Sequence, residues 1–169
     1  YIFEPEVIDL IPSGVSFDIG SDLFPLLAER GLPFYAQGRP FNWLDIGTMS
    51  DYWEVLQTVL TGEVNHMHVP GIQIKPGLWV GLNTSIDWEG TTIEGPVYIG
   101  SGCKIEAGTR IVGPTWIGHG SHICEGAEVV RSVLFEYTRV LHDVTLNEMI
   151  VFKEYSVDRN GEMKHTSEY

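Results

Sequence analysis

Three histidines in the second half of the chain could support catalysis or metal binding. His119 and His122 lie close together in sequence, and His142 follows them. A histidine between stacked coils can act as a general base in acyl transfer, and three converging imidazoles can bind zinc. His66 and His68 form a second pair, which lacks a third ligand in the sequence around it. Solvated surface histidines are the simpler interpretation of all five, and both functions stay open as alternatives.

One aspartate stands where metal chemistry is possible. Asp45 lies in the segment Asn42-Trp-Leu-Asp-Ile-Gly-Thr48, at the end of a short apolar run. A carboxylate in this position can hold Mg²⁺, which prefers oxygen ligands, or it can accept a hydrogen bond from the amide of Gly47 or Thr48. Because one carboxylate does not build a metal site, the residues by themselves favour the structural role.

The charge of the chain disfavours two classes of partner. Lys and Arg number 10 against 23 Asp and Glu, so the formal net charge is −13. Such an acidic surface repels the phosphates of nucleic acids and of anionic membranes. The chain also contains no run of 18 apolar residues and no signal-peptide pattern at its start. We therefore expect a cytoplasmic protein that binds neither nucleic acid nor membrane.

The first 61 residues have the pattern of an α/β domain. We expect a strand end at residues 1–3, a helical turn at 6–11, a helix at 22–30 ended by Gly31, and strands at 33–36 and 42–46. Thr48 and Asp51 have the spacing of a capping box and predict a helix that ends near Gly62. So few residues hold too small a core for an independent domain, and the segment is predicted to be a remnant of a larger one.

The second half is a repeat with a period of six. Small or short residues follow four positions after each aliphatic one, as Cys103 and Ser121 do. A triangular coil explains this period, since each hexad is one short strand plus a corner, and about twelve hexads make roughly four coils. The prediction is a left-handed parallel β-helix in a mainly β chain. The residues that define the repeat are Ile93, Ile99, Ile105, Ile111, Ile117 and Ile123.

The repeat also assigns faces to residues around it. After Val129 the register slips and resumes at Leu134, Val140, Leu146 and Phe152, all predicted to point inward. Cys103 is predicted to lie inside and Cys124 outside, and two thirds of a disulfide framework are missing, so both are expected to be free thiols. The outward aromatic residues form either a contact surface or a strip partly buried under the linker or tail. They are Trp79, Trp88, Tyr98 and Trp116.

Four regions follow from these patterns. Residues 1–62 are the end of an α/β domain, residues 63–76 a linker, residues 77–153 the β-helix, and residues 154–169 a hairpin and tail. Asn160-Gly161 favours a type I′ turn in that hairpin, which would close the open end of the coil.

The Trp-Leu-Asp-x-Gly-Thr segment followed by Asp51-Tyr52 resembles the late catalytic motif of sugar-1-phosphate nucleotidyltransferases. Residues 1–7 and 17–25 are similar to that family in order and spacing. The best likeness is to the mannose-1-phosphate guanylyltransferase branch, which carries a hexapeptide β-helix, and residues 154–161 resemble tails of that branch. The resemblance covers nearly the whole chain.

This resemblance implies a reaction in which a sugar-1-phosphate oxygen attacks the α-phosphorus of a nucleoside triphosphate and releases pyrophosphate. GTP, mannose-1-phosphate and the product GDP-mannose are favoured. Asp45 would hold Mg²⁺ together with an earlier aspartate that has no counterpart here. The Gly-rich phosphate loop and the lysine of the family are also without counterpart. No complete catalytic set is therefore present, and the isolated 169-residue chain is expected to be inactive.

Two alternatives from other classes remain. The chain could be a non-catalytic module that acts through oligomerisation, or a hexapeptide acyltransferase. In the parent enzyme, the β-helix would carry no chemistry, would pack on the catalytic domain and would mediate homo-oligomer formation.

Overall fold

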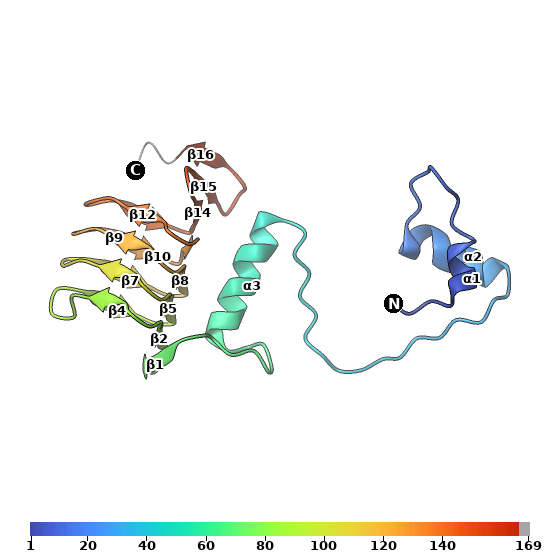
Figure 1. The fold of residues 1–169 in the computed structure, drawn as a ribbon, viewed down its shortest axis with the longest axis horizontal. Coiled ribbons are helices and arrows are strands. Elements are labelled where there is room, and N and C mark those ends of the chain that lie inside the picture. The colour runs from blue at the N-terminus through green and yellow to red at the C-terminus, as the bar shows by residue number, and fades with distance from the viewer. Residues whose placement is uncertain (166–169) are drawn as a thin grey trace. The chain divides into compact units, whose positions relative to one another are not determined.

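The structure, a computed structural model, describes residues 1–165. It divides into two compact units, of which the first is Tyr1–Phe41 and the second begins at Asn42 (Figure 1). No helix in the described part of the chain has the length and apolar character needed to cross a bilayer.

The first unit is a small group of helices. It contains α1 (Pro5–Ile8), the π-helix η1 (Ile19–Leu23) and α2 (Phe24–Glu29). The Asp18 carboxylate caps η1 by accepting from the Ser21 amide at 2.7 Å. Gly31 follows α2 with φ +63°, in the left-handed conformation expected after a helix end. The predicted helix at 22–30 is thus present, with its first turn wound as part of η1.

The predicted strands at residues 1–3, 33–36 and 42–46 are wrong for this chain. All three segments are loops, and Trp43 is 73% exposed. A strand needs a neighbour to pair its backbone amides and carbonyls, and no described segment pairs with any of these three. Local residue preference therefore did not suffice to form them.

Helix α3 (Met49–Thr61) has the ends that its sequence predicts. Thr48 Oγ1 accepts from the Asp51 amide at 3.1 Å, and Asp51 Oδ2 accepts from the Thr48 amide at 2.8 Å, which completes a capping box. The helix ends at Gly62, whose φ is +79°. The predicted capping box and helix end are confirmed.

We expect Thr48→Ala to destabilise the protein by about 1 kcal/mol, because the first turn of α3 loses its side-chain acceptor. Thermal unfolding followed by circular dichroism measures the change. Ser50→Ala is the matched control in the same turn, where the replaced hydroxyl caps nothing, and it should lie within about 0.5 kcal/mol of the parent chain. Equal losses in the two variants would show that the capping box contributes nothing.

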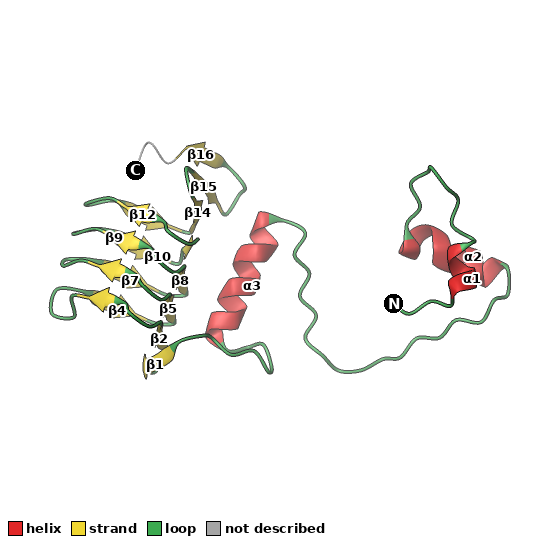
Figure 2. Ribbon diagram, viewed as in Figure 1, coloured by secondary structure: helices red, strands yellow, loops and turns green. Residues whose placement is uncertain are grey.

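The rest of the second unit is a parallel β-helix with three sheets (Figure 2). One sheet stacks β2 (Leu78–Val80), β5 (Val97–Ile99), β8 (Thr115–Ile117), β11 (Val133–Leu134) and β14 (Met149–Phe152). The second stacks β3 (Ser85–Ile86), β6 (Lys104–Ile105), β9 (His122–Ile123) and β12 (Arg139–Val140). The third stacks β4 (Thr92–Glu94), β7 (Arg110–Val112), β10 (Glu128–Val130) and β13 (Thr145–Asn147). The predicted mainly β chain with a parallel β-helix is confirmed.

Stacked aliphatic side chains fill the interior of the coils. Ile99 pairs in register with Ile117, and Ile117 with Leu134, so equivalent residues of successive coils lie one above another. Five of the six repeat isoleucines, from Ile99 to Ile123, are at most 2% exposed, and Ile93 is half-buried against them. Each such side chain contributes roughly 1.5–3 kcal/mol by leaving water.

Phe152 is a correction to the predicted register. It is 45% exposed, whereas Val151 is 4% exposed and pairs with Leu134 inside the coil. The corner after Leu146 is one residue shorter than a full hexad, as is the corner after Val129. A strict sixfold count therefore runs one residue too far.

Additional strands flank the large sheet at both ends. β1 (Ile72–Lys75), which falls in the predicted linker, pairs antiparallel with β2. At the other end β14 pairs with β15 (Tyr155–Asp158), and β15 with β16 (Met163–His165). The hairpin forms as expected but without a type I′ turn. Gly161 donates to the carbonyl of Asp158 and alone of the Asn-Gly pair has a positive φ, so the connection is a three-residue loop.

Glycine is required where the corners of successive coils approach most closely. A Cβ atom on Gly100 would lie 2.5 Å from the amide nitrogen of His119, and one on Gly118 would lie 2.6 Å from that of Glu136. Backbone atoms of the next coil cannot yield as a flexible side chain would, so these positions exclude any side chain.

Candidate functional site

Helix α3 lies along the large sheet of the β-helix (Figure 1). Trp53 is 8% exposed and packs with Val133 and Ile150, and Trp116 and Phe135 border this cluster. The contact joins the last helix of the region that resembles an α/β domain to the coils that follow it.

Polar contacts hold Trp53 in that interface. Its indole N–H donates to the carbonyl of Arg131 at 3.2 Å, and the Arg159 guanidinium lies 5.2 Å from its ring centre. Arg159 also lies 3.9 Å from Glu54 of α3, so the terminal hairpin contributes to holding the helix.

The predicted aromatic strip is divided between the two interpretations. Trp116 packs against the α3 cluster, and its ring centre lies 4.1 Å from that of Tyr98. Trp79 is half-buried as well, and Trp88 is 54% exposed. Partial burial therefore describes three of the four residues, and the element that covers Trp116 is α3 rather than the linker or tail.

Asp45 lies in the loop that leads into α3. Its side chain is exposed, and its Oδ1 accepts from the amide of Ile46 at 3.0 Å. The amides of Gly47 and Thr48 donate instead to Asp51 Oδ2, at 3.2 and 2.8 Å. The structural role considered for Asp45 is thus performed by Asp51. The hydrogen bond with Thr48 lowers the pKa of the Asp51 carboxyl below its ordinary value.

Magnesium chemistry fits Asp45 in part. An exposed carboxylate on a loop whose exit is fixed by a capped helix can offer an oxygen ligand, and Mg²⁺ commonly takes one or two carboxylates besides water and phosphate oxygens. In the described residues, Asp45 belongs to no group of three candidate ligands. Asp45 would therefore supply one ligand of a shared site, and its role in metal binding stays a prediction.

An apolar groove opens beside the start of α3. It lies between that helix and the terminal hairpin and has a volume of about 490 Å³. Its walls are formed by Met49, Phe135, Ile150, Phe152, Tyr155, Val157, Gly161 and Met163. A second hollow, which Ile46, Gly47, Thr48 and Tyr52 help to line, adjoins it through Met49 and Phe135.

The histidines do not converge on one another. His122 Nε2 lies 2.8 Å from Glu106 Oε1, while His119 lies 3.9 Å from Glu136 and edge-on to Tyr137. The structure instead brings His142 close to Glu106 and Cys124. The sequence does not assemble a three-histidine site.

The two thiols are both free and both buried. Cys103 is 1% exposed as predicted, its Sγ lies 3.2 Å from the carbonyl oxygen of Gly118, and burial raises its pKa. The prediction that Cys124 faces outward is wrong, since Cys124 is also 1% exposed. It follows the inward Ile123 at a corner, where side chains of the adjacent coils cover it.

A sequence signal for the Cys124 cluster existed in the spacing. Glu106, Cys124 and His142 are separated by 18 residues each, which is three hexads and therefore one coil. Three side chains with that spacing are stacked at one corner, a relation that is visible only once the triangular coil is assumed.

Comparison with known proteins agrees with the resemblance seen in the sequence. Residues 1–62, which end with the cap of α3, match the family described as nucleotidyl transferase. Together with the β-helix, this match defines the class: the chain is the C-terminal portion of a sugar-1-phosphate nucleotidyltransferase, as the sequence predicted.

One curated relative gives a more particular likeness. Over 161 residues the chain is 49% identical to a protein of Synechocystis sp. named UTP–glucose-1-phosphate uridylyltransferase. The match covers 95% of this chain and 42% of that protein, so the chain spans less than half the length of the relative.

Proposed function

We propose that this chain is part of a longer enzyme that transfers a nucleotidyl group from a nucleoside triphosphate to a sugar-1-phosphate. The observation that carries the proposal is the family match over residues 1–62, supported by a relative with 49% identity along nearly the whole chain. The motif around Asp45 falls within the matched region.

Mg²⁺ would neutralise the phosphate charge that builds up when the sugar phosphate attacks the α-phosphorus. The residues of this chain contribute position. Asp45 offers an exposed carboxylate, the capping box at Thr48 and Asp51 sets the start of α3, and Trp53 anchors that helix to the β-helix. The β-helix thereby supports one ligand of the reaction site and takes no part in the chemistry.

The substrate pair is proposed from the relative. Its name specifies UTP and glucose-1-phosphate, and 49% identity favours the same pair here. The sequence motifs favoured GTP and mannose-1-phosphate, which form the second candidate pair. A cytoplasmic location and homo-oligomer formation through the β-helix belong to this proposal as well. The apolar groove beside Met49 is suited to contact with more of the catalytic domain.

The test is a panel of four triphosphates against glucose-1-phosphate and mannose-1-phosphate, with pyrophosphate release as the readout. The whole protein is expected to turn over UTP with glucose-1-phosphate best. A preference for GTP with mannose-1-phosphate would select the second pair, and no turnover of any combination would refute the proposal. The 169-residue chain tested alone should release no pyrophosphate, since one carboxylate does not assemble the site.

A further inference from the structure

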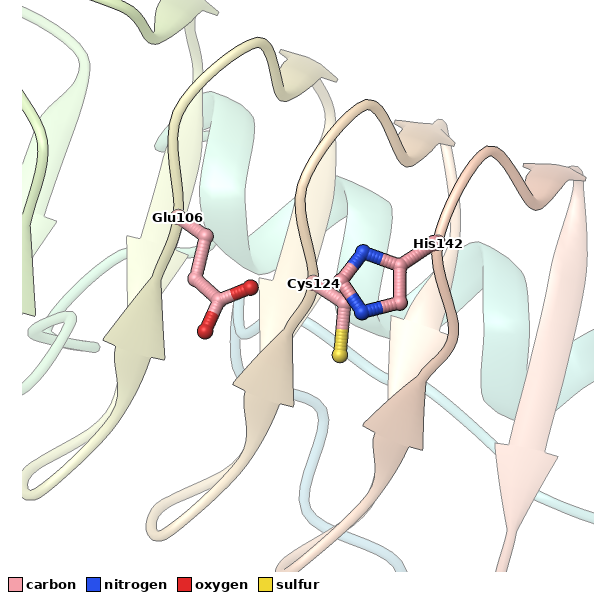
Figure 3. A group of neighbouring side chains, drawn as sticks. All are labelled: Glu106, Cys124 and His142. Carbon is pink, nitrogen blue, oxygen red and sulfur yellow. The ribbon is translucent and has the colours of Figure 1, made fainter.

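Three chemically different ligand groups meet at one corner of the β-helix. Glu106, Cys124 and His142 come from three successive coils, and one ligand atom of each lies within 4.8 Å of the other two. Figure 3 shows the thiol of Cys124 between the carboxylate of Glu106 on one neighbouring coil and the imidazole of His142 on the other. The corner is remote in sequence from Asp45 and belongs to no part of the proposed reaction.

The carboxylate in this cluster is held in place from several sides. Glu106 Oε1 accepts from Lys104 Nζ at 2.5 Å and lies 2.8 Å from His122 Nε2. Its other oxygen, Oε2, accepts from the amide of Glu125 at 3.0 Å. Each carboxylate oxygen has two lone pairs, so a group oriented in this way can still accept a further partner.

We propose that Glu106, Cys124 and His142 form a zinc site that joins three successive coils. A thiolate, an imidazole and a carboxylate are all zinc ligands, and a thiolate selects against Mg²⁺ and Ca²⁺. Three protein ligands leave the fourth tetrahedral position to a water molecule. His122 acts as a positioning residue, because its contact orients the Glu106 carboxylate.

The geometry requires only side-chain movement. Zinc–ligand bonds of about 2.0–2.3 Å put tetrahedral ligand atoms about 3.5 Å apart. The observed limit of 4.8 Å therefore closes by about 1 Å, and the exposed imidazole of His142 has two side-chain torsions with which to move. Binding releases the proton of the Cys124 thiol to solvent, since the ligand is the thiolate.

Cobalt provides the direct test, because Co²⁺ bound by a thiolate absorbs in the near ultraviolet. The reduced, chelator-treated chain should develop this band on titration with Co²⁺, saturate at one ion per chain, and lose the band when Zn²⁺ is added. Cys124→Ser should abolish the band. His142→Gln should weaken Co²⁺ binding at least 10-fold, and His122→Gln should weaken it about 10-fold through the misplaced carboxylate.

Matched controls come from the same coils. Cys103→Ser removes the other buried thiol and should keep the band, and His119→Gln removes an imidazole that makes no contact with the cluster and should leave Co²⁺ affinity unchanged. If Cys124→Ser does not fold, the exposed His142 carries the test through its variant. Absence of the band in the parent chain, its persistence in Cys124→Ser, or equal weakening by the His119 and His142 variants would overturn the proposal.

Discussion

Replacing Asp45 by Asn in the whole protein is expected to lower kcat/KM by roughly 100-fold or more. Mg²⁺ contributes several kcal/mol of charge stabilisation to phosphoryl chemistry, and each 1.36 kcal/mol is tenfold in rate. Because the amide keeps the size of the side chain and removes its charge, the loss reports on metal binding. The Asp45 side chain is exposed, so the folded structure should persist. Steady-state pyrophosphate release over a range of Mg²⁺ concentrations measures the effect, and the Mg²⁺ requirement should rise.

Asp51→Asn is the matched control for that experiment. It removes a carboxylate six residues further along, while the amide oxygen can still accept from Gly47 and Thr48. We expect its activity to stay within about threefold of the parent enzyme, a change of less than 1 kcal/mol. If the Asp45 variant retained activity at the same level as this control, Asp45 would be no metal ligand.

Trp53→Ala is expected to destabilise the chain by about 3 kcal/mol or more, because it empties the centre of the contact between α3 and the large sheet. For a chain of this length that corresponds to a decrease in Tm of roughly 6–12 °C. Chemical denaturation followed by circular dichroism provides the free energy. Trp53→Phe keeps most of the ring but loses the hydrogen bond to the Arg131 carbonyl, which costs about 1 kcal/mol.

Trp88→Ala is the matched control, since Trp88 is 54% exposed against 8% for Trp53. A surface substitution of this kind changes stability by no more than about 0.5 kcal/mol. Equal effects of the two alanine variants would show that α3 does not depend on the β-helix for its stability.

The β-helix was predictable because its sequence rule is local and repeated. One aliphatic residue every six positions specifies a strand and a corner, and stacking of identical units then follows from strand pairing. The ends of α3 were predictable for the same reason, since Thr48, Asp51 and Gly62 act within one turn of the helix. The repeat failed at Phe152, where a shortened corner has no signal in the residues that precede it.

Other features depended on the tertiary structure. Residues 33–36 and 42–46 have strand-forming sequences, but a strand is stable only when another segment satisfies its backbone, and the described residues provide none. The burial of Trp53 and Trp116 also required knowing which sheet α3 covers.

The amino-acid sequence by itself determined the repeat, the helix caps and the motif around Asp45, because each depends on residues a few positions apart. Only the tertiary structure decided that Cys124 is buried beside Glu106 and His142, and that Asp51 rather than Asp45 caps α3. The physical reason is that the contacts of a side chain depend on which coils and helices become neighbours. That choice is made by the packing of the whole chain.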